Sequence, residues 1–235
     1  VFGQHDLGAR QTIDLVDQLR NTYIPNSGFP ENARIYLGGA PAQGVDLLDS
    51  LGKAFPLVVS VILLFTFFVL LRTFRSIVLS VKAIILDLLS IGLSFSALVI
   101  VFRFGVGTYQ LEQIEAWVLI LLFAILFGLS MDYEIFIVSR MREARDRGAS
   151  NEEAIREGMQ ASGTVVTAAA LIFISALTGL ISGHFAGLQQ LGVGLAIGVI
   201  VDATIIRGLL LPSAMVLLGR WNWWMPVQRK TPTLK

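Results

Sequence analysis

The first chemically informative feature is an acidic side chain next to a phenol inside a long apolar stretch. Asp132 and Tyr133 lie in the run from Phe127 to Arg140, eight residues before the arginine. In a helix this distance places Asp132 roughly 12 Å inside the apolar stretch. A carboxylate at the centre of a membrane-spanning helix costs about 2.5 to 3.5 kcal/mol, so it normally faces protein or a water-filled cavity. We therefore predict that Asp132 and Tyr133 form a proton relay, because intramembrane acids commonly bind and release protons.

Two of the apolar stretches contain three further charged side chains. Glu134 lies about 200° around a helix from Asp132 and is a candidate for a second relay group. Lys82 and Asp87 are assigned no function: they either extend to the membrane surface or pair with each other. Their spacing of five residues is poor for a pair on one α-helix.

A second charged pair lies in the last apolar stretch. We expect Asp202 to pair with Arg207 or with a neighbouring helix, and we favour a structural or supporting charge over a primary relay. Gly194 and Gly198 precede Asp202 at intervals of four residues. This spacing predicts close packing of the last span near the third and fourth spans.

The composition indicates an integral membrane protein. Hydrophobic residues make up 54% of the 235 residues and charged residues only 15%, too few to cover a soluble protein of this size. The 18 basic and 17 acidic residues nearly cancel, so the charge balance does not favour a nucleic acid as a partner. With no cysteine and two histidines, disulfides and cysteine chemistry are excluded, and a metal site is disfavoured.

Five apolar stretches have about the 20 residues that a helix needs to cross a bilayer. Their approximate bounds are 54–71, 76–102, 115–139, 161–183 and 188–218. In the third stretch, Ala124 and Gly128 precede Asp132 at intervals of four residues. Small residues in this arrangement let another helix approach closely, so we expect Asp132 to lie at a helix–helix seam.

The N-terminal segment, residues 1–53, differs from the rest. Its pattern predicts a helix over 9–21, a short strand at 34–37 and an amphipathic lead-in helix over 43–53. These elements have too few apolar residues to bury a core of their own. We interpret the segment as the end of a larger α+β domain outside the membrane.

Basic residues predict the orientation of the chain in the membrane. They concentrate after the first and third spans and in the tail, 220–235, so this side is expected to be cytoplasmic and the N-terminal segment exterior or periplasmic. Ser150 and Glu153 form a capping-box pattern, which predicts a cytoplasmic surface helix over 150–160 without an assigned function. Three tryptophans after the last span should anchor it at the lipid headgroups: Trp221, Trp223 and Trp224.

Several of these motifs together resemble a known family. The run from Phe127 to Arg140, which reads FGLSMDYEIFIVSR, Val201-Asp-Ala-Thr204, and Leu218-Gly-Arg220 with the tryptophans are similar to the MmpL (mycobacterial membrane protein large) branch of the RND transporter superfamily. The resemblance covers the last three spans closely and the first two loosely. It implies two similar halves, each with one span, an exported porter domain and five more spans. The third span here would then be the tenth of twelve, and residues 1–53 the end of the second porter domain.

The resemblance also implies a function. In the family, an Asp-Tyr pair in each half meets its counterpart and carries the protons that drive lipid export. Carried over, Asp132 and Tyr133 form one half of the relay, and the N-terminal half of the same transporter, or another chain, supplies the second pair. The implied protein resides in the inner (plasma) membrane and exports lipids or other hydrophobic molecules, with protons as coupling ions and no other cofactor.

Other functions share single features with the transporter. A SecDF-like partner in protein export also uses intramembrane acids, but the Asp-Tyr-Glu context and the tryptophan-rich end favour the MmpL branch. A sterol-sensing-like module without transport activity stays open. An intramembrane aspartyl protease using Asp132 and Asp202 is disfavoured, because such enzymes carry Tyr-Asp and Gly-x-Gly-Asp motifs, and this sequence carries neither at these positions. We therefore expect a transporter and not an enzyme.

Overall fold

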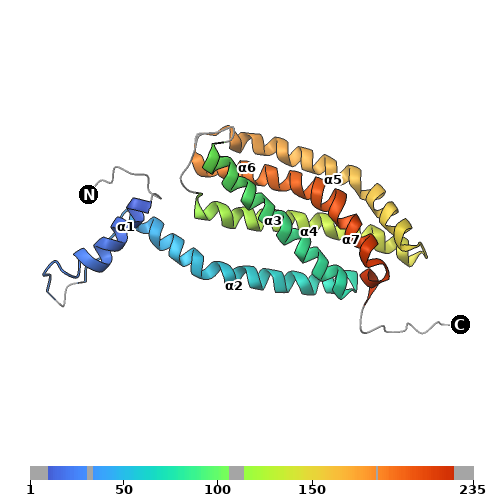
Figure 1. The fold of residues 1–235 in the computed structure, drawn as a ribbon, viewed down its shortest axis with the longest axis horizontal. Helices are drawn as coiled ribbons and strands as arrows, with labels where there is room; N and C mark the ends of the chain where they lie inside the picture. The colour runs from blue at the N-terminus through green and yellow to red at the C-terminus, as the bar shows by residue number, and fades with distance from the viewer. Residues whose placement is uncertain (1–9, 31–33, 106–113, 184, 225–235) are drawn as a thin grey trace.

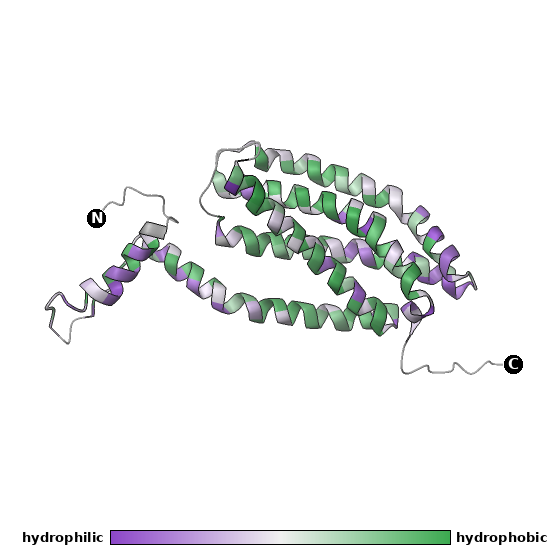
Figure 2. Cartoon of the chain, in the orientation of Figure 1, coloured by the Kyte–Doolittle hydropathy of each residue, from purple (hydrophilic) through white to green (hydrophobic). Residues whose placement is uncertain are grey.

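The computed structural model describes residues 10–30, 34–105, 114–183 and 185–224, and the regular elements in these ranges are all helices (Figure 1). Five helical segments are long and apolar enough to cross a membrane: Ala40–Phe74, Ile77–Phe104, Trp117–Asp146, Asn151–Ile181 and Ala186–Trp223. The chain is therefore an α-helical, multi-pass membrane protein, as its composition predicts. In Figure 2 the hydrophobic colours run along the middle of the bundle, and the hydrophilic colours gather on α1 and at the connection between α4 and α5.

The described ranges contain ten helical elements. In chain order they are α1 (Arg10–Gln18), η1 (Leu19–Tyr23), α2 (Ala40–Phe74), α3 (Ile77–Phe104), α4 (Ala116–Asp146), α5 (Asn151–Ile181), α6 (Ala186–Val201), η2 (Asp202–Leu210), α7 (Leu211–Leu218) and η3 (Gly219–Trp223). Helices α3 to α7 form the bundle, α2 runs along one side of it, and α1 lies apart beside the start of α2 (Figure 1).

The N-terminal segment contains helix but no strand within the described residues. Helix α1 and the π-helical turn η1 occupy most of the region where a helix is expected. Residues 34–38 have no regular secondary structure, so the strand expected at 34–37 is absent, and an α+β porter fragment is not shown. A strand needs a neighbouring strand for its backbone hydrogen bonds, and the described part of the chain offers none.

Two expected surface helices are continuous with membrane spans. Residues 43–53 belong to the same helix as the first span, because nothing between Lys53 and Ala54 ends a helix. Helix α5 begins at Asn151 with the capping box that its sequence predicts: Ser150 Oγ accepts from the backbone N–H of Glu153, and the Glu153 side chain accepts from the Ser150 N–H. It then runs without a break into the fourth span.

The C-terminal turn η3 packs against the ends of other helices. Asn222 is fully buried, its side-chain amide donates to the Met215 carbonyl at 2.6 Å, and its own carbonyl accepts from Ser76 Oγ at 2.6 Å. Trp223 Nε1 donates to Asn151 Oδ1 at 3.0 Å, so this indole joins η3 to the start of α5. The tryptophans Trp221 and Trp224, in contrast, are exposed, as an anchor in lipid headgroups would be.

The close packing that the last span needs comes from its glycines. A Cβ at Gly194 would lie 2.1 Å from a Leu122 methyl, and one at Gly198 would lie 2.4 Å from a Leu126 methyl. A further glycine, Gly192, is similarly close to the end of α5. Helix α6 therefore packs closely against the third and fourth spans, as expected.

The bundle core consists of two apolar clusters with polar residues between them along the chain. On α4, one cluster ends at Phe127 and the other begins at Ile137. Ser130 and Glu134 lie in this gap and are buried. The corresponding gap on α3, after Leu86, contains Asp87 and Ser90, which are also buried. These side chains form a polar layer between the two apolar clusters.

Candidate functional site

Asp132 lies on an open face of the bundle. Asp132, Ala124 and Gly128 are all exposed. A Cβ added at Gly128 would meet no atom within 4 Å. The expected seam is therefore not formed with another helix of the described ranges. The buried side of α4 is instead the side that contacts the α6 glycines through Leu122 and Leu126. The small-residue stripe that carries Asp132 is free for contact with a different protein surface.

Five charged side chains are buried among the described residues, and they come from three elements. They are Lys82 and Asp87 on α3, Glu134 on α4, and Asp202 and Arg207 on η2. Each is less than one tenth exposed. Buried charges are rarely tolerated without partners, so this group is the strongest candidate for a functional cluster in the described chain.

Asp202 and Arg207 form the buried ion pair of this cluster. Arg207 Nε donates to Asp202 Oδ2 at 2.7 Å, which confirms one of the two partners expected for Asp202. The spacing of five residues is suitable here because η2 is a π-helix, in which the backbone bonds run from residue i to i+5. Pro212, just after this turn, lacks the N–H for a regular α-helical bond, and this favours the wider helix.

Ser130 joins the ion pair to α3. Its Oγ lies 2.5 Å from Asp87 Oδ1 and 2.8 Å from Asp202 Oδ1. The same oxygen accepts from Arg207 Nη2 at 2.8 Å, and Nη2 also donates to the Ser130 carbonyl. One hydroxyl on α4 thus contacts two carboxyl groups and a guanidinium from two other elements, α3 and η2.

Tyr133 connects this buried cluster with the open face of α4. The Arg207 guanidinium lies 5.4 Å from the centroid of the Tyr133 ring, within the range of a cation–π contact. Tyr133 is partly buried, whereas its neighbour Asp132 is exposed. The two members of the predicted relay therefore face different surroundings, as their 100° separation on a helix requires.

Lys82 and Glu134 extend the cluster along the bundle. Both are buried, and Lys82 Nζ and Glu134 Oε1 have no hydrogen-bond partner among the described protein atoms. Neither expectation for Lys82 and Asp87 holds: Asp87 is fully buried and bonds to Ser130, not to Lys82.

The sequence did not predict the contact between Asp87 and Ser130, although one signal was available. On α3, several small polar residues and Asp87 recur at intervals of three, four or seven, which places them on one helix face; all of them are buried: Ser80, Asp87, Ser90 and Ser94. A polar stripe of this kind within an apolar span indicates a protein-facing polar contact.

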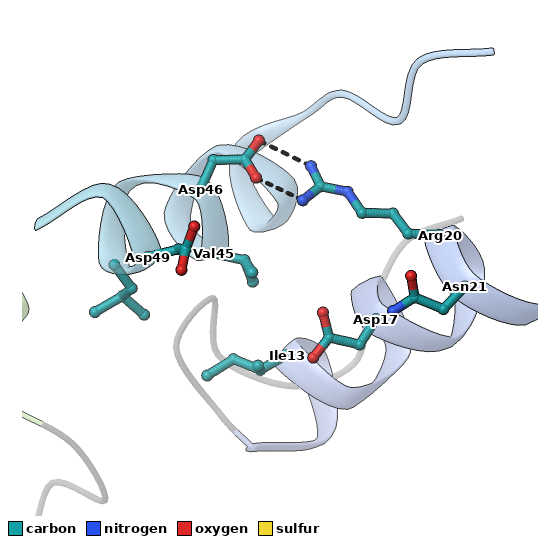
Figure 3. Close-up of a pocket in the computed structure, with 8 residues that line it drawn as sticks. Ile13, Asp17, Arg20, Asn21, Val45, Asp46 and Asp49 are labelled. Atoms are coloured by element: carbon teal, nitrogen blue, oxygen red, sulfur yellow. Dashed lines mark hydrogen bonds and ion pairs between the residues drawn. The ribbon is translucent and has the colours of Figure 1, made fainter. Parts of the chain in front are cut away.

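Other potential sites are less developed. In the described ranges no group of three or more His, Asp or Glu residues could hold a metal ion; His5 and His184 lie outside those ranges. An open hollow of about 560 Å³ lies between α1 and the start of α2 (Figure 3). Its lining includes an ion pair between Arg20 and Asp46, with N–O distances of 2.5 and 2.8 Å. Two acidic neighbours, Asp17 and Asp49, complete a polar surface away from the buried cluster.

Comparison with known proteins identifies the family. The sequence profile of the MMPL family matches residues 4–234. The chain belongs to the MMPL family. This confirms the resemblance of the Asp-Tyr segment and of the tryptophan-rich end to that family.

Curated MMPL relatives are 35 to 38% identical to this chain over the aligned residues. The mycolic acid-containing lipids exporter MmpL11 of Mycolicibacterium smegmatis is 35% identical over 225 residues, 94% of this chain and 23% of the relative. The heme uptake protein MmpL11 of Mycobacterium tuberculosis has the same identity and coverage. The trehalose monomycolate exporter MmpL3 of Mycobacterium tuberculosis is 38% identical over 201 residues, 84% of this chain and 21% of the relative. The chain thus spans less than a quarter of the length of these MMPL proteins.

Proposed function

We propose that this MMPL chain is the C-terminal part of a transporter, and not an enzyme, that uses the proton-motive force to export lipids or other hydrophobic molecules. It acts in the inner (plasma) membrane, with the N-terminal segment on the exterior or periplasmic side and the C-terminus in the cytoplasm. Asp132 and Tyr133 are the proton relay, and Glu134, Asp202 and Arg207 support it. Protons are the coupling ions, and no other cofactor is required.

The observation that carries this proposal is the exposed carboxylate of Asp132 in the middle of a membrane span. A charge in contact with lipid at this depth is strongly disfavoured. The adjacent positions, Ala124 and Gly128, are small and uncovered, which is suitable for close approach of a second helix. We propose that the N-terminal half of the same transporter covers this face and brings a second Asp-Tyr pair to Asp132.

The contact between Tyr133 and Arg207 gives the relay a route to the bundle interior. A change of charge at Asp132 alters the electrostatic environment of its neighbour Tyr133. Because the Tyr133 ring lies against the Arg207 guanidinium, this change reaches the ion pair with Asp202 on η2. A π-helical segment is a common site of local rearrangement in functional helices. Protonation would thus bias the position of the last span relative to α3 and α4.

The names of the relatives support lipids as the proposed substrates. Two of the MMPL relatives are named as exporters of mycolic acid-containing lipids and of trehalose monomycolate. A third is named for heme uptake, so we propose hydrophobic molecules as the wider substrate class.

Replacement of Asp132 tests the relay. In the natural full-length polypeptide, Asp132→Asn keeps the size of the side chain but cannot exchange a proton, and we expect proton-driven lipid export to fall to background. The matched control is Asp146→Asn at the exposed end of α4, where the carboxylate pairs with Arg142 at 3.3 Å; its export should stay normal. Undiminished export by Asp132→Asn, at equal expression, would refute the relay.

A further inference from the structure

Ser130 lies between two carboxyl groups that compete for its single proton. Its Oγ is within hydrogen-bond distance of Asp87 Oδ1 at 2.5 Å and of Asp202 Oδ1 at 2.8 Å. A serine hydroxyl has one proton to donate and two lone pairs that accept. One lone pair already accepts from Arg207 Nη2, which leaves one proton and one lone pair for two carboxyl oxygens.

Two ionised carboxylates cannot both bond to this hydroxyl. One of them can accept the serine proton, but the other would then place an anionic oxygen against an oxygen lone pair at hydrogen-bond distance. The contact becomes favourable when the second carboxyl carries a proton and donates it to Ser130 Oγ. The geometry therefore requires one more proton than the hydroxyl supplies.

The extra proton belongs on Asp87. Asp202 accepts a charge-assisted bond from Arg207 Nε at 2.7 Å, which stabilises its ionised form. Asp87 has no cation bonded to it among the described residues, and its second oxygen, Oδ2, has no hydrogen-bond partner there. We propose that Asp87 is a proton-binding residue of this transporter, whose proton is held by Ser130 and can pass through it to Asp202.

The charge balance of the cluster independently agrees. Besides Asp87, the buried charged groups of the cluster are Lys82 on the same helix, Glu134 on α4, and Asp202 and Arg207 on η2. With Asp87 protonated, two cations face two carboxylates and the buried cluster is neutral. With Asp87 ionised, an uncompensated negative charge would lie in the apolar interior, which is costly.

Proton transfer along this path leaves the number of O–H bonds unchanged. The O–H bond of Asp87 breaks as its proton passes to Ser130 Oγ, and the original hydroxyl proton of Ser130 moves to Asp202 Oδ1. The negative charge then lies on Asp87, and the neutral Asp202 no longer forms an ion pair with Arg207. One transfer thus converts the bond that holds η2 from an ionic to a neutral contact.

Unpartnered polar atoms provide a way for protons to reach Asp87. Lys82 Nζ, Glu134 Oε1 and Asp87 Oδ2 are buried and have no protein partner among the described atoms. Buried polar groups of this kind are usually bonded by ordered water. Because Lys82 lies only five residues after the start of α3, this side of the cluster points towards the end of the bundle that the basic residues predict to be cytoplasmic.

Infrared difference spectroscopy tests where the proton resides, without any transport. The natural full-length polypeptide in lipid nanodiscs is compared with single variants at neutral pH. We expect Asp87→Asn to remove one carbonyl-stretch band of a protonated carboxylic acid, and Asp87→Glu to shift it. The surface control Asp146→Asn should retain the band. An unchanged band in Asp87→Asn, or its loss in Asp202→Asn alone, would overturn the proposal.

Folding and function are separated by two further readouts. Asparagine can donate to Ser130 as a protonated Asp87 does, so Asp87→Asn should keep the thermal unfolding temperature, whereas Asp87→Leu should lower it. An Asp87→Asn variant that unfolds at the lower temperature of Asp87→Leu would contradict a neutral Asp87. The role in transport rests on the proposed function: proton-coupled export by folded Asp87→Asn should be lost. If instead Asp132→Asn exports normally, the proposed relay fails while the infrared result still locates the proton.

Discussion

The guanidinium of Arg207 lies 5.4 Å from the centre of the Tyr133 ring and also bonds to Asp202 and Ser130. Arg207 therefore contacts both the buried acid network and a member of the Asp-Tyr pair. The residue next to Tyr133, Asp132, is exposed on the outer face of α4. Any event at that face can reach the buried network through one ring and one guanidinium.

Tyr133→Phe tests the contribution of the phenol hydroxyl separately from that of the aromatic ring. Phenylalanine keeps an aromatic face against Arg207, so we expect unchanged thermal stability, but the loss of the phenol should abolish proton-coupled export. Tyr133→Leu removes the cation–π contact as well, which is worth about 0.5 to 2 kcal/mol, and should additionally lower the unfolding temperature. Full export by Tyr133→Phe would show that the ring alone is sufficient.

Removal of one partner of the buried ion pair should be more harmful than removal of both. Arg207→Met leaves the Asp202 carboxylate buried without its cation, and we expect a loss of about 3 to 5 kcal/mol. Asp202→Asn should similarly leave the Arg207 guanidinium buried without its carboxylate. A double-mutant cycle with Arg207→Met and Asp202→Asn can be measured by unfolding in detergent. The double variant should lose less unfolding free energy than the two single variants lose together. Additive losses would contradict a direct coupling.

The packing of α6 predicts a size limit at Gly198. A Cβ there would lie 2.4 Å from Leu126 Cδ1 and 2.9 Å from Ser94 Oγ, so Gly198→Ala must displace α4 or α3. We expect a destabilisation of about 1 to 3 kcal/mol. Gly179→Ala on α5 is the matched control, because a Cβ at that position meets no atom within 4 Å. Equal unfolding temperatures for the two variants would contradict the close contact.

The sequence predicts contacts between neighbouring residues better than contacts between residues far apart in the chain. Local signals are sufficient for the five apolar helices and for the Ser150–Glu153 capping box, because length and capping are properties of neighbouring residues. The contact of Asp202 with Arg207 is also anticipated, although the π-helix that allows it is not.

Partners from distant parts of the chain were harder to predict. Ser130 and Asp87 are 43 positions apart, and no periodicity relates one helix to the rotation of another. The open position of Asp132 was missed for the same reason: a stripe of small residues predicts that something packs there but not which surface. The strand expected at 34–37 depended on local pattern alone, and a strand requires a partner.

The ion pair between Arg20 and Asp46 should make the N-terminal segment sensitive to acid. It joins η1 to the start of α2, ahead of the uncharged stretch that begins at Ala54 (Figure 3). The hydrogen bonds from Arg20 lower the pKa of the Asp46 carboxyl below its ordinary value. A carboxyl with a lowered pKa in the folded state stabilises that state above its unfolded pKa of about 3.9. This contribution is lost as the pH falls through the lowered value.

We therefore expect the contact between η1 and α2 to be constant near neutral pH and to loosen only in acid, below about pH 4. Spin labels at Asn21 and Leu47, introduced as cysteines into a chain segment that contains none, would report the separation by pulsed electron resonance. Asp46→Asn should give the loosened distance at every pH, because it removes the titrating group and the ion pair together. A natural protein that loosens already near neutral pH, or an Asp46→Asn variant that keeps the short distance, would show that other contacts hold α1 and η1 against α2.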